Sequence, residues 1–368
     1  MEYDAITFDA QTIHSNSFHF DGGLLAQLKQ FQKGPPQVVV SEIVVREVLK
    51  SLIDKARAAK DSVESAHKKA VDYGLRSADM PVHPNGEPDF RAISRARWQA
   101  YLNDIGAMVL PVDDVSVRDL TRLYFSPAPP FSASGKKKNE FPDAIALLSL
   151  EGWAKNNGKR ILAVSADGDW EKYATGSDSI DVVLDLGEAL ASLQKHAEEA
   201  AAVAQRLLVE IASKKDSKRR EIFEDLLSVE ISGHGFDGDA ESSYYTEVDQ
   251  VEVSYTGFSF LGDEVDNNFR VVQYDRSRIV IESDLVVNVV AEGGFSLSVY
   301  DSIDKDYVGM GSASSTMDVE LEITTLITFA GDVNSEDLDV KRVEIVDAPY
   351  SIDFGYVEPD HGEDYYDE

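Results

Sequence analysis

The sequence of 368 residues contains no cysteine, only seven histidines and no long apolar run. The lack of cysteine excludes disulfide bonds and thiolate metal sites, and it fits a reducing compartment. No apolar run approaches the roughly 20 residues of a membrane-spanning helix. Residues 1–4 also lack the basic and apolar segments with which a signal peptide begins. We therefore expect a cytoplasmic protein with no membrane partner.

Basic residues are scarce in the back of the chain. The net charge is -32, but residues 1–220 contain 31 acidic and 29 basic side chains, whereas residues 221–368 contain 36 and 6. Residues 221–368 therefore form a polyanion, which repels nucleic acid unless it faces away from the bound strand. The chain contains 43% hydrophobic and 9% aromatic residues, a composition typical of folded proteins. Its length allows two domains.

The front of the chain alternates short apolar runs with helical segments, which is typical of an open parallel sheet flanked by helices. Ser41 is a suitable N-cap for the helix after the second run, Pro142 opens a later helix and Gly158 closes it. A turn at 80–86 interrupts the charged helical segment 52–105. The expected strands are 5–8, 37–40, 108–112, 160–165 and 182–186, with a further helix at 115–124.

The pattern changes after residue 186. Residues 186–227 are rich in alanine, lysine and glutamate with helical periodicity, which predicts a long helix with a break near 213–216. Beyond it, apolar and polar residues alternate, which predicts an antiparallel sheet in a sandwich or barrel. We therefore expect an α/β domain at 1–190, a helical connector at 191–227, an acidic all-β domain at 228–357 and a disordered acidic tail at 358–368.

Four carboxylates in the front domain lie where strands end or helices begin. Asp9 follows the first apolar run and Asp167 follows the run at 160–165, while Asp143 lies in the first turn of the helix at Pro142 and Glu47 on the helix after Ser41. Because the carboxyl ends of parallel strands form one crevice, these side chains could meet there. Four carboxylates suit Mg²⁺ or Mn²⁺, and such an ion assists phosphodiester hydrolysis.

Each of these residues also has an ordinary structural interpretation. Asp9 could cap a loop, Glu47 could be solvated on its helix, and Asp143 could stabilise the helix dipole. Glu42 is an alternative to Glu47, but a separation of five positions on a helix turns it about 140° away from Glu47. After the fourth strand, Ser165 could orient a carboxylate or a water, and Asp169 could be an outer ligand or a turn residue.

The order of these motifs is more specific than any one of them. Phe8 and Asp9, residues 44–47, residues 140–143 and residues 165–170 follow one another as Phe-Asp, Val-Val-Arg-Glu, Glu-Phe-Pro-Asp and Ser-Ala-Asp-Gly-Asp-Trp. In this order they resemble the PIN domain, a metal-dependent nuclease fold, over residues 1–190. The Glu-Phe-Pro-Asp stretch is similar to a bacterial PIN-like branch. The β domain is not covered by the resemblance.

The resemblance implies an endonuclease that cuts single-stranded RNA, or less often DNA, with Mg²⁺ or Mn²⁺. It implies catalytic, metal-holding roles for Asp9, Glu47, Asp143 and Asp167, with Asp169 as a further ligand and Ser165 and Glu140 as supporting residues. A toxin or defence role and pairing into a homodimer agree with it. The β domain would regulate activity or bind a protein partner.

Two groups of cations in the front domain could contact substrate phosphates. The run Lys136, Lys137 and Lys138 shortly precedes Asp143 and is a candidate nucleic-acid-binding segment. Residues 91–97 add three arginines beside Trp98, which would suit single-strand binding, although ordinary surface arginines are the favoured interpretation.

The chain departs from the family pattern at one important place. The family often has threonine and asparagine directly after the first aspartate, whereas Ala10 and Gln11 stand there and Thr12 comes one place later. The alternative function is an inactive PIN scaffold that acts as a protein-interaction module. Retention of all four acids argues against it, because clustered carboxylates without a cation repel one another and raise their pKa values.

Overall fold

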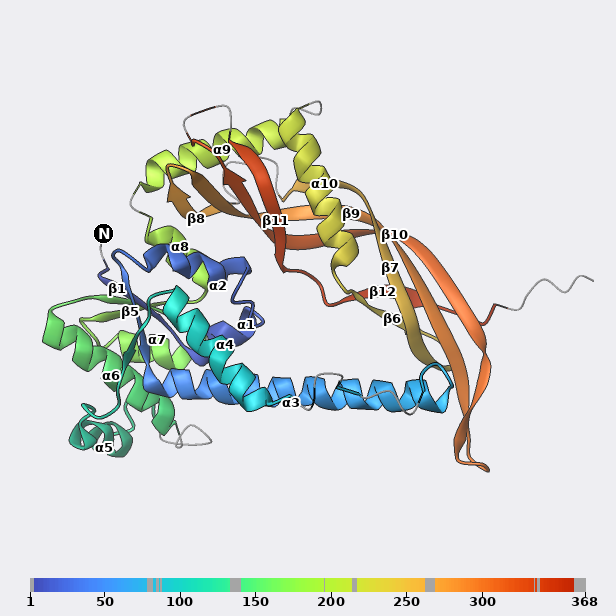
Figure 1. Cartoon of the computed structure of the whole chain (residues 1–368), viewed down its shortest axis with the longest axis horizontal. Helices are drawn as coiled ribbons and strands as arrows, with labels where there is room; N and C mark the ends of the chain where they lie inside the picture. The colour runs from blue at the N-terminus through green and yellow to red at the C-terminus, as the bar shows by residue number, and fades with distance from the viewer. Residues whose placement is uncertain are drawn as a thin grey trace, which may run out of the picture. The chain divides into compact units, whose positions relative to one another are not determined.

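The computed structural model describes residues 3–77, 82–83, 86, 88–132, 140–194, 196–213, 217–261, 269–333, 335 and 338–360. The chain forms two compact units, residues 1–195 and 196–368 (Figure 1). No described helix is both long and apolar enough to cross a lipid bilayer.

The first unit is built on a five-stranded parallel sheet in the order β3-β2-β1-β4-β5. Its central strands β1 and β4 are buried along their whole length, because helices cover both faces of the sheet. The predicted α/β class is therefore confirmed. The strands are β1 Ala5–Phe8, β2 Gln37–Ser41, β3 Met108–Leu110, β4 Ile161–Val164 and β5 Ile180–Val183.

The helices of this unit begin and end close to the predicted positions. The Ser41 hydroxyl caps α3 by accepting from the Ile43 N–H at 3.4 Å. Helix α6 begins at Phe141, one residue before the predicted Pro142, and its last residue Asn157 is followed by the capping Gly158, whose φ of 60° suits glycine. The helices are α1 Ala10–Ser15, α2 Gly23–Gln27, η1 Leu28–Phe31, α3 Glu42–Asp72, α4 Phe90–Asp104, α5 Val117–Phe125, α6 Phe141–Asn157, α7 Gly168–Ala174 and α8 Leu186–Ser192.

The last expected strand of this unit lies two to three residues too far along the chain. The sequence suggested 182–186, whereas β5 ends at Val183. The reason is local, since the Asp185 carboxylate accepts from the Glu188 N–H at 2.8 Å and so begins α8 directly after the strand. An N-cap aspartate competes with strand formation because it fixes the first turn of a helix.

The direction of chain winding reverses between β1 and β4. From β1 the chain moves outward to β2 and β3 on one side, then returns to β4 and β5 on the other. In open parallel sheets the crevice outside the carboxyl ends of such a strand pair is the usual ligand position. A backbone bond from the Asp9 N–H to the Val164 carbonyl, 3.1 Å, holds these two strand ends together.

The second unit is an antiparallel sheet in the order β11-β10-β9-β7, with β8 also paired to β9 and a separate parallel pair of β12 and β6. The predicted antiparallel β class is confirmed for this unit. Its elements are α9 Ala197–Ser213, α10 Lys218–Gly233, β6 Asp237–Glu241, β7 Tyr245–Phe260, β8 Phe269–Asp275, β9 Arg278–Asp301, β10 Asp306–Ala330, β11 Asp339–Asp347 and β12 Ser351–Tyr356.

Helices α9 and α10 belong to the core of this second unit. Leu208 of α9 and Phe223 and Leu227 of α10 are fully buried in one hydrophobic cluster with Val287 and Phe295 of β9. The segment expected as a connector at 191–227 therefore supplies α9 and the first part of α10 to this core. Of the tail expected at 358–368, residues 361–368 lie outside the described residues.

Candidate active site

Asp9 lies at the carboxyl end of β1 and is the N-cap of α1. Its side chain is 6% exposed and is fixed from two directions. Oδ1 accepts from the backbone N–H and the hydroxyl of Thr12, both at 2.7 Å, and Oδ2 accepts from the Ser165 hydroxyl at 2.5 Å. Asp9 is thus a preorganised carboxylate at the point where the winding of the sheet reverses.

The segment after β4 supplies three further polar groups. Ser165 is fully buried, and while its hydroxyl donates to Asp9, its oxygen accepts from the Asp167 N–H at 3.1 Å. Asp167 is exposed and caps α7 by accepting from the Asp169 N–H at 2.8 Å. Asp169 is 4% exposed and forms an ion pair with Lys172 at 3.0 Å. The expected helper role of Ser165 therefore has a geometric basis.

Glu47 and Asp143 approach the same place from α3 and α6, and both are partly buried. Burial, followed by the charges of Asp143 and Asp9, raises the pKa of Glu47. The pKa of Asp143 is also raised, chiefly by burial and further by Asp167, Asp9 and Asp169, although a hydrogen bond from Trp170 opposes the shift. Each of these side chains lies close enough to another to influence its pKa. The structure therefore places all five predicted carboxylates near one another.

Two other acids near the site have different partners. Glu42, the alternative to Glu47, forms an ion pair with Arg46 and accepts from the Val112 N–H at 3.3 Å. Glu140 is the N-cap of α6, and its carbonyl accepts from the Ala144 N–H at 3.2 Å. Glu42 is thus committed to holding the start of α3, whereas Glu140 fixes the helix that carries Asp143.

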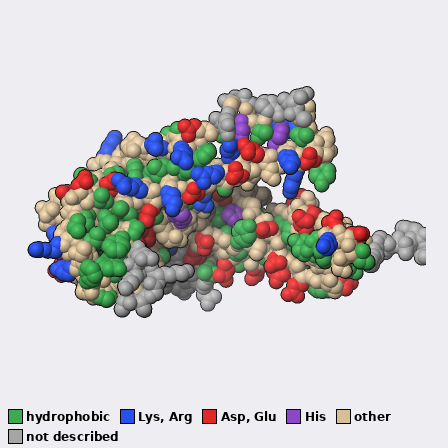
Figure 2. All heavy atoms as spheres, turned by 90° about the horizontal axis from the view of Figure 1, so that it is seen from below, with side chains coloured by type: hydrophobic (Ala, Val, Ile, Leu, Met, Phe, Trp, Pro, Cys, Tyr) green, Lys and Arg blue, Asp and Glu red, His purple; other side chains and the backbone are tan. Residues whose placement is uncertain are grey.

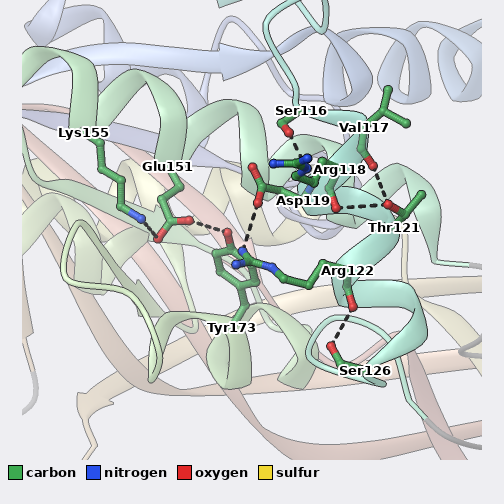
Figure 3. Close-up of polar contacts among 10 residues, drawn as sticks. All are labelled: Ser116, Val117, Arg118, Asp119, Thr121, Arg122, Ser126, Glu151, Lys155 and Tyr173. Atoms are coloured by element: carbon green, nitrogen blue, oxygen red, sulfur yellow. Dashed lines mark hydrogen bonds and ion pairs between the residues drawn. The ribbon is translucent and has the colours of Figure 1, made fainter.

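Helices α6 and α7 are joined by two contacts that position the carboxylates. The Trp170 indole N–H donates to Asp143 Oδ1 at 3.2 Å. About two turns further along α6, Glu151 accepts from the Tyr173 hydroxyl at 2.8 Å and pairs with Lys155 at 3.0 Å (Figure 3). Although burial alone would raise the pKa of Glu151, the bonds from Tyr173, Lys155 and Ser177 lower it. A charged Glu151 therefore anchors α7 to α6.

Tyr173→Phe should destabilise the first unit by about 1.5–3 kcal/mol, because the lost bond goes to a charged, partly buried carboxylate. Denaturant unfolding measures this change. Tyr124→Phe is the matched control, since the Tyr124 hydroxyl makes no hydrogen bond to any described residue. Equal stability of the two variants would show that the Glu151–Tyr173 bond does not anchor α7.

The donor chemistry of the site fits a hard divalent cation. All candidate ligands are carboxylate oxygens, and within the described part of the chain Asp169 is the one of the five that has an ion-pair partner. The pKa of Glu47 and that of Asp143 are raised by burial and like charges, which a cation would offset. The side chains share a neighbourhood without converging, since no three acidic or histidine residues among those described are arranged to hold an ion.

The expected cationic residues divide into two cases. Lys136, Lys137 and Lys138 lie outside the described residues. Trp98, beside the three arginines, is 2% exposed and donates its indole N–H to the Val45 carbonyl at 3.2 Å. Arg97 donates to the Phe18 carbonyl at 2.8 Å. Trp98 is therefore a core residue that cannot stack on a nucleic-acid base.

Comparison with known families decides what the first unit is. Residues 6–170 match the family model described as the PIN domain. The first unit is a PIN domain. The match includes all five carboxylates, and no family model matches the second unit, as the sequence led us to expect. Neither a curated protein nor a solved structure matches the chain. PIN domains are in general nucleases that bind nucleic acid and typically use divalent metal ions.

Two site residues of this PIN domain were missed or undervalued by sequence reasoning. Thr12 seemed displaced from the family's threonine position, yet its backbone and hydroxyl both reach Asp9 because α1 begins immediately after β1. Trp170 was seen only as part of a motif, whereas it binds Asp143 across α6 and α7. Spacing of three residues from an N-cap aspartate could have identified Thr12, but the contact of Trp170 depends on tertiary packing.

Proposed function

We propose that this chain is an endonuclease that hydrolyses phosphodiester bonds of single-stranded nucleic acid, with RNA preferred over DNA. The observation that carries the proposal is the gathering of five carboxylates where the winding of a PIN-domain sheet reverses. Carboxylates alone repel a phosphate. A cation bound by them would neutralise the charge of the carboxylates and of the phosphate. Mg²⁺ and Mn²⁺ are hard cations that suit carboxylate ligands.

Asp9, Glu47, Asp143 and Asp167 would hold the cation, with Asp169 as an outer residue because Lys172 already neutralises it. A bound divalent cation supplies charge stabilisation for the attacked phosphate and lowers the pKa of a water molecule. The protein's own part is to fix the ligands. Thr12 and Ser165 hold Asp9, and Trp170 holds one oxygen of Asp143.

Cleavage of labelled strands tests the proposal. The full chain is incubated with single-stranded RNA, single-stranded DNA and duplex RNA of one sequence, with Mn²⁺, with Mg²⁺ or with a chelator. We expect cutting of the single-stranded RNA that depends on the cation and stops with the chelator. Failure of the full chain and of residues 1–195 to cut any strand under these conditions would contradict the proposal and favour a non-enzymatic PIN scaffold.

Thr12→Val should lower the cleavage rate by about 10- to 100-fold, the usual range for residues that orient metal ligands. Valine keeps the shape of threonine but removes the hydroxyl that holds Asp9 Oδ1. Single-turnover cleavage at several cation concentrations measures the effect. Thr121→Val is the control, because that hydroxyl contacts only carbonyls of its own helix α5. Similar losses in both variants would argue against a role of Thr12 in orienting Asp9.

A further inference from the structure

The end of the β9–β10 strand pair exposes an unusual group of tyrosines. Tyr245, Tyr300 and Tyr307 are 57%, 53% and 52% exposed. Their rings pack on one another, with centroids 4.9 Å apart for Tyr245 and Tyr307 and 5.3 Å apart for Tyr300 and Tyr307. We call this region the ribbon end and define it as residues 245–249 and 298–310.

Strand register places these rings on the face of the sheet opposite the core. Tyr300 of β9 pairs with Tyr307 of β10, and Tyr245 of β7 pairs with Ser298, which lies two residues before Tyr300 on β9. On β9 the core side chains are Phe295 and Leu297, both buried, and the residues that alternate with them point outward. Because the tyrosines lie on the outward side, they add nothing to the core of the second unit.

Aliphatic side chains extend the exposed surface around the turn. Ile303 is 87% exposed, and Val299, Val308 and Met310 are each more than 40% exposed. Figure 2 shows hydrophobic and acidic side chains gathered at this end of the second unit. Val299 and Val308 pair with each other next to the Tyr300–Tyr307 pair, so they lie on the other face of the sheet from the tyrosines. Exposed apolar side chains on both faces of one strand end usually mark an interaction site.

The surroundings of the tyrosines are strongly acidic. The ribbon end and its turn include Glu247, Asp249, Asp301, Asp304 and Asp306. Lys305 is the one basic residue of this segment, since the other five basic residues after position 221 lie in or next to β8, the first residue of β9, and β11. The register places Arg278 opposite Ala330 and Asp301 opposite Asp306, at the two ends of the strand pair.

We propose that the ribbon end is a docking site for a protein segment rich in arginine and lysine. A planar guanidinium stacks well on a tyrosine face, and its N–H groups pair with nearby carboxylates. The same charges exclude other occupants. Nucleic acid and anionic lipid would be repelled, and two ribbon ends of identical chains would bring like charges together. This proposal concerns only the second unit and stands independently of the nuclease proposal.

Binding of a labelled peptide of alternating arginine and glycine to the full chain tests the proposal, with the glutamate–glycine peptide as the probe control. We expect the arginine peptide alone to bind, and to bind more weakly as salt increases. The combined change Tyr300→Ser and Tyr307→Ser should weaken binding about tenfold, because it removes two ring faces without changing the charge. Tyr73→Ser with Tyr350→Ser, at exposed positions elsewhere, should leave binding unchanged.

A charge comparison separates local recognition from general attraction to a polyanion. Asp304→Asn with Asp306→Asn should weaken binding more than Asp225→Asn with Asp347→Asn, although both pairs remove two negative charges. Circular dichroism and melting temperature check that each variant folds. The proposal is overturned if the wild-type chain does not bind the arginine peptide, if the two variant pairs behave alike, or if single-stranded RNA or a second copy of the chain occupies the ribbon end instead.

Discussion

Asp143→Asn should reduce cleavage by about 100- to 10,000-fold and, at the same time, raise the thermal stability of the cation-free protein. The first effect follows because cation-based stabilisation of the attacked phosphate amounts to several kcal/mol. The second follows because Asp143 is held among like charges. Opposite changes in activity and stability distinguish a site residue from a structural one, since loss of a structural residue lowers both.

The direction of the stability change follows from proton linkage. Burial, together with the charges of Asp167, Asp9 and Asp169, raises the pKa of Asp143 above its value in the unfolded chain. The folded state therefore binds the proton more tightly, so stability is fully present below the unfolded pKa and is lost as pH rises through the folded pKa. Asparagine does not ionise, so the variant does not lose this stability as pH rises. As pH rises from the unfolded pKa of Asp143 through its folded pKa, the melting temperature of the variant should accordingly fall less than that of the wild type.

Melting curves in chelator across this pH range, combined with cleavage rates in Mn²⁺, measure both effects. Glu188→Gln is the control, because Glu188 also lies in the first turn of a helix but is exposed and has no part in the site. It should retain cleavage and should not gain stability. A variant at Asp143 that melts at a lower temperature than the wild type, yet still cuts, would refute the assignment.

A fragment of residues 1–195 should fold and retain cleavage, whereas a fragment of residues 1–227 should aggregate. The shorter fragment contains the whole PIN domain and every site residue. The longer one also contains α9 and part of α10, whose apolar faces would lack the sheet that covers them. Leu207, Leu208 and Phe223 are buried in the full chain, and each such side chain contributes roughly 1.5–3 kcal/mol when buried.

Size-exclusion chromatography and binding of a hydrophobic dye measure the difference between the two fragments. Residues 1–195 should elute as a compact species with little dye binding and should cut single-stranded RNA at a rate similar to that of the full chain. Compact, dye-free behaviour of residues 1–227 would mean that α9 and α10 do not need the second unit. Inactivity of a well-folded 1–195 fragment alongside an active full chain would mean that the second unit contributes to catalysis.

Local signals in the sequence were sufficient for most of the first unit. Ser41 and Gly158 mark the ends of helices because their conformational preferences hold in almost any context. The apolar runs at β1 and β4 are short and uninterrupted, as strands buried on both faces must be. The position of the carboxylates then follows from topology, since parallel strands bring their carboxyl ends to one edge.

The remaining features depend on tertiary packing and left no local signal. The amphipathic pattern of α9 showed that one face is buried, but not that Leu208 and Ile211 pack in the core of the second unit. The sequence did not reveal that Asp169 is buried and paired with the exposed Lys172 while Asp167 is itself exposed, because two aspartates in one turn look alike. The bond from Trp170 to Asp143 joins two helices and could be known only from their packing.

The length of the β9–β10 strand pair has an evolutionary consequence. The two strands stay paired from Arg278 opposite Ala330 to Asp301 opposite Asp306, while the buried core extends along β9 only to Leu297. Substitutions at exposed positions beyond that point cost little folding stability, typically within about 0.5 kcal/mol. The outer part of the strand pair is therefore free to change its side chains under selection, and partner choice can diverge among descendants of this chain while the fold and the carboxylate site are conserved.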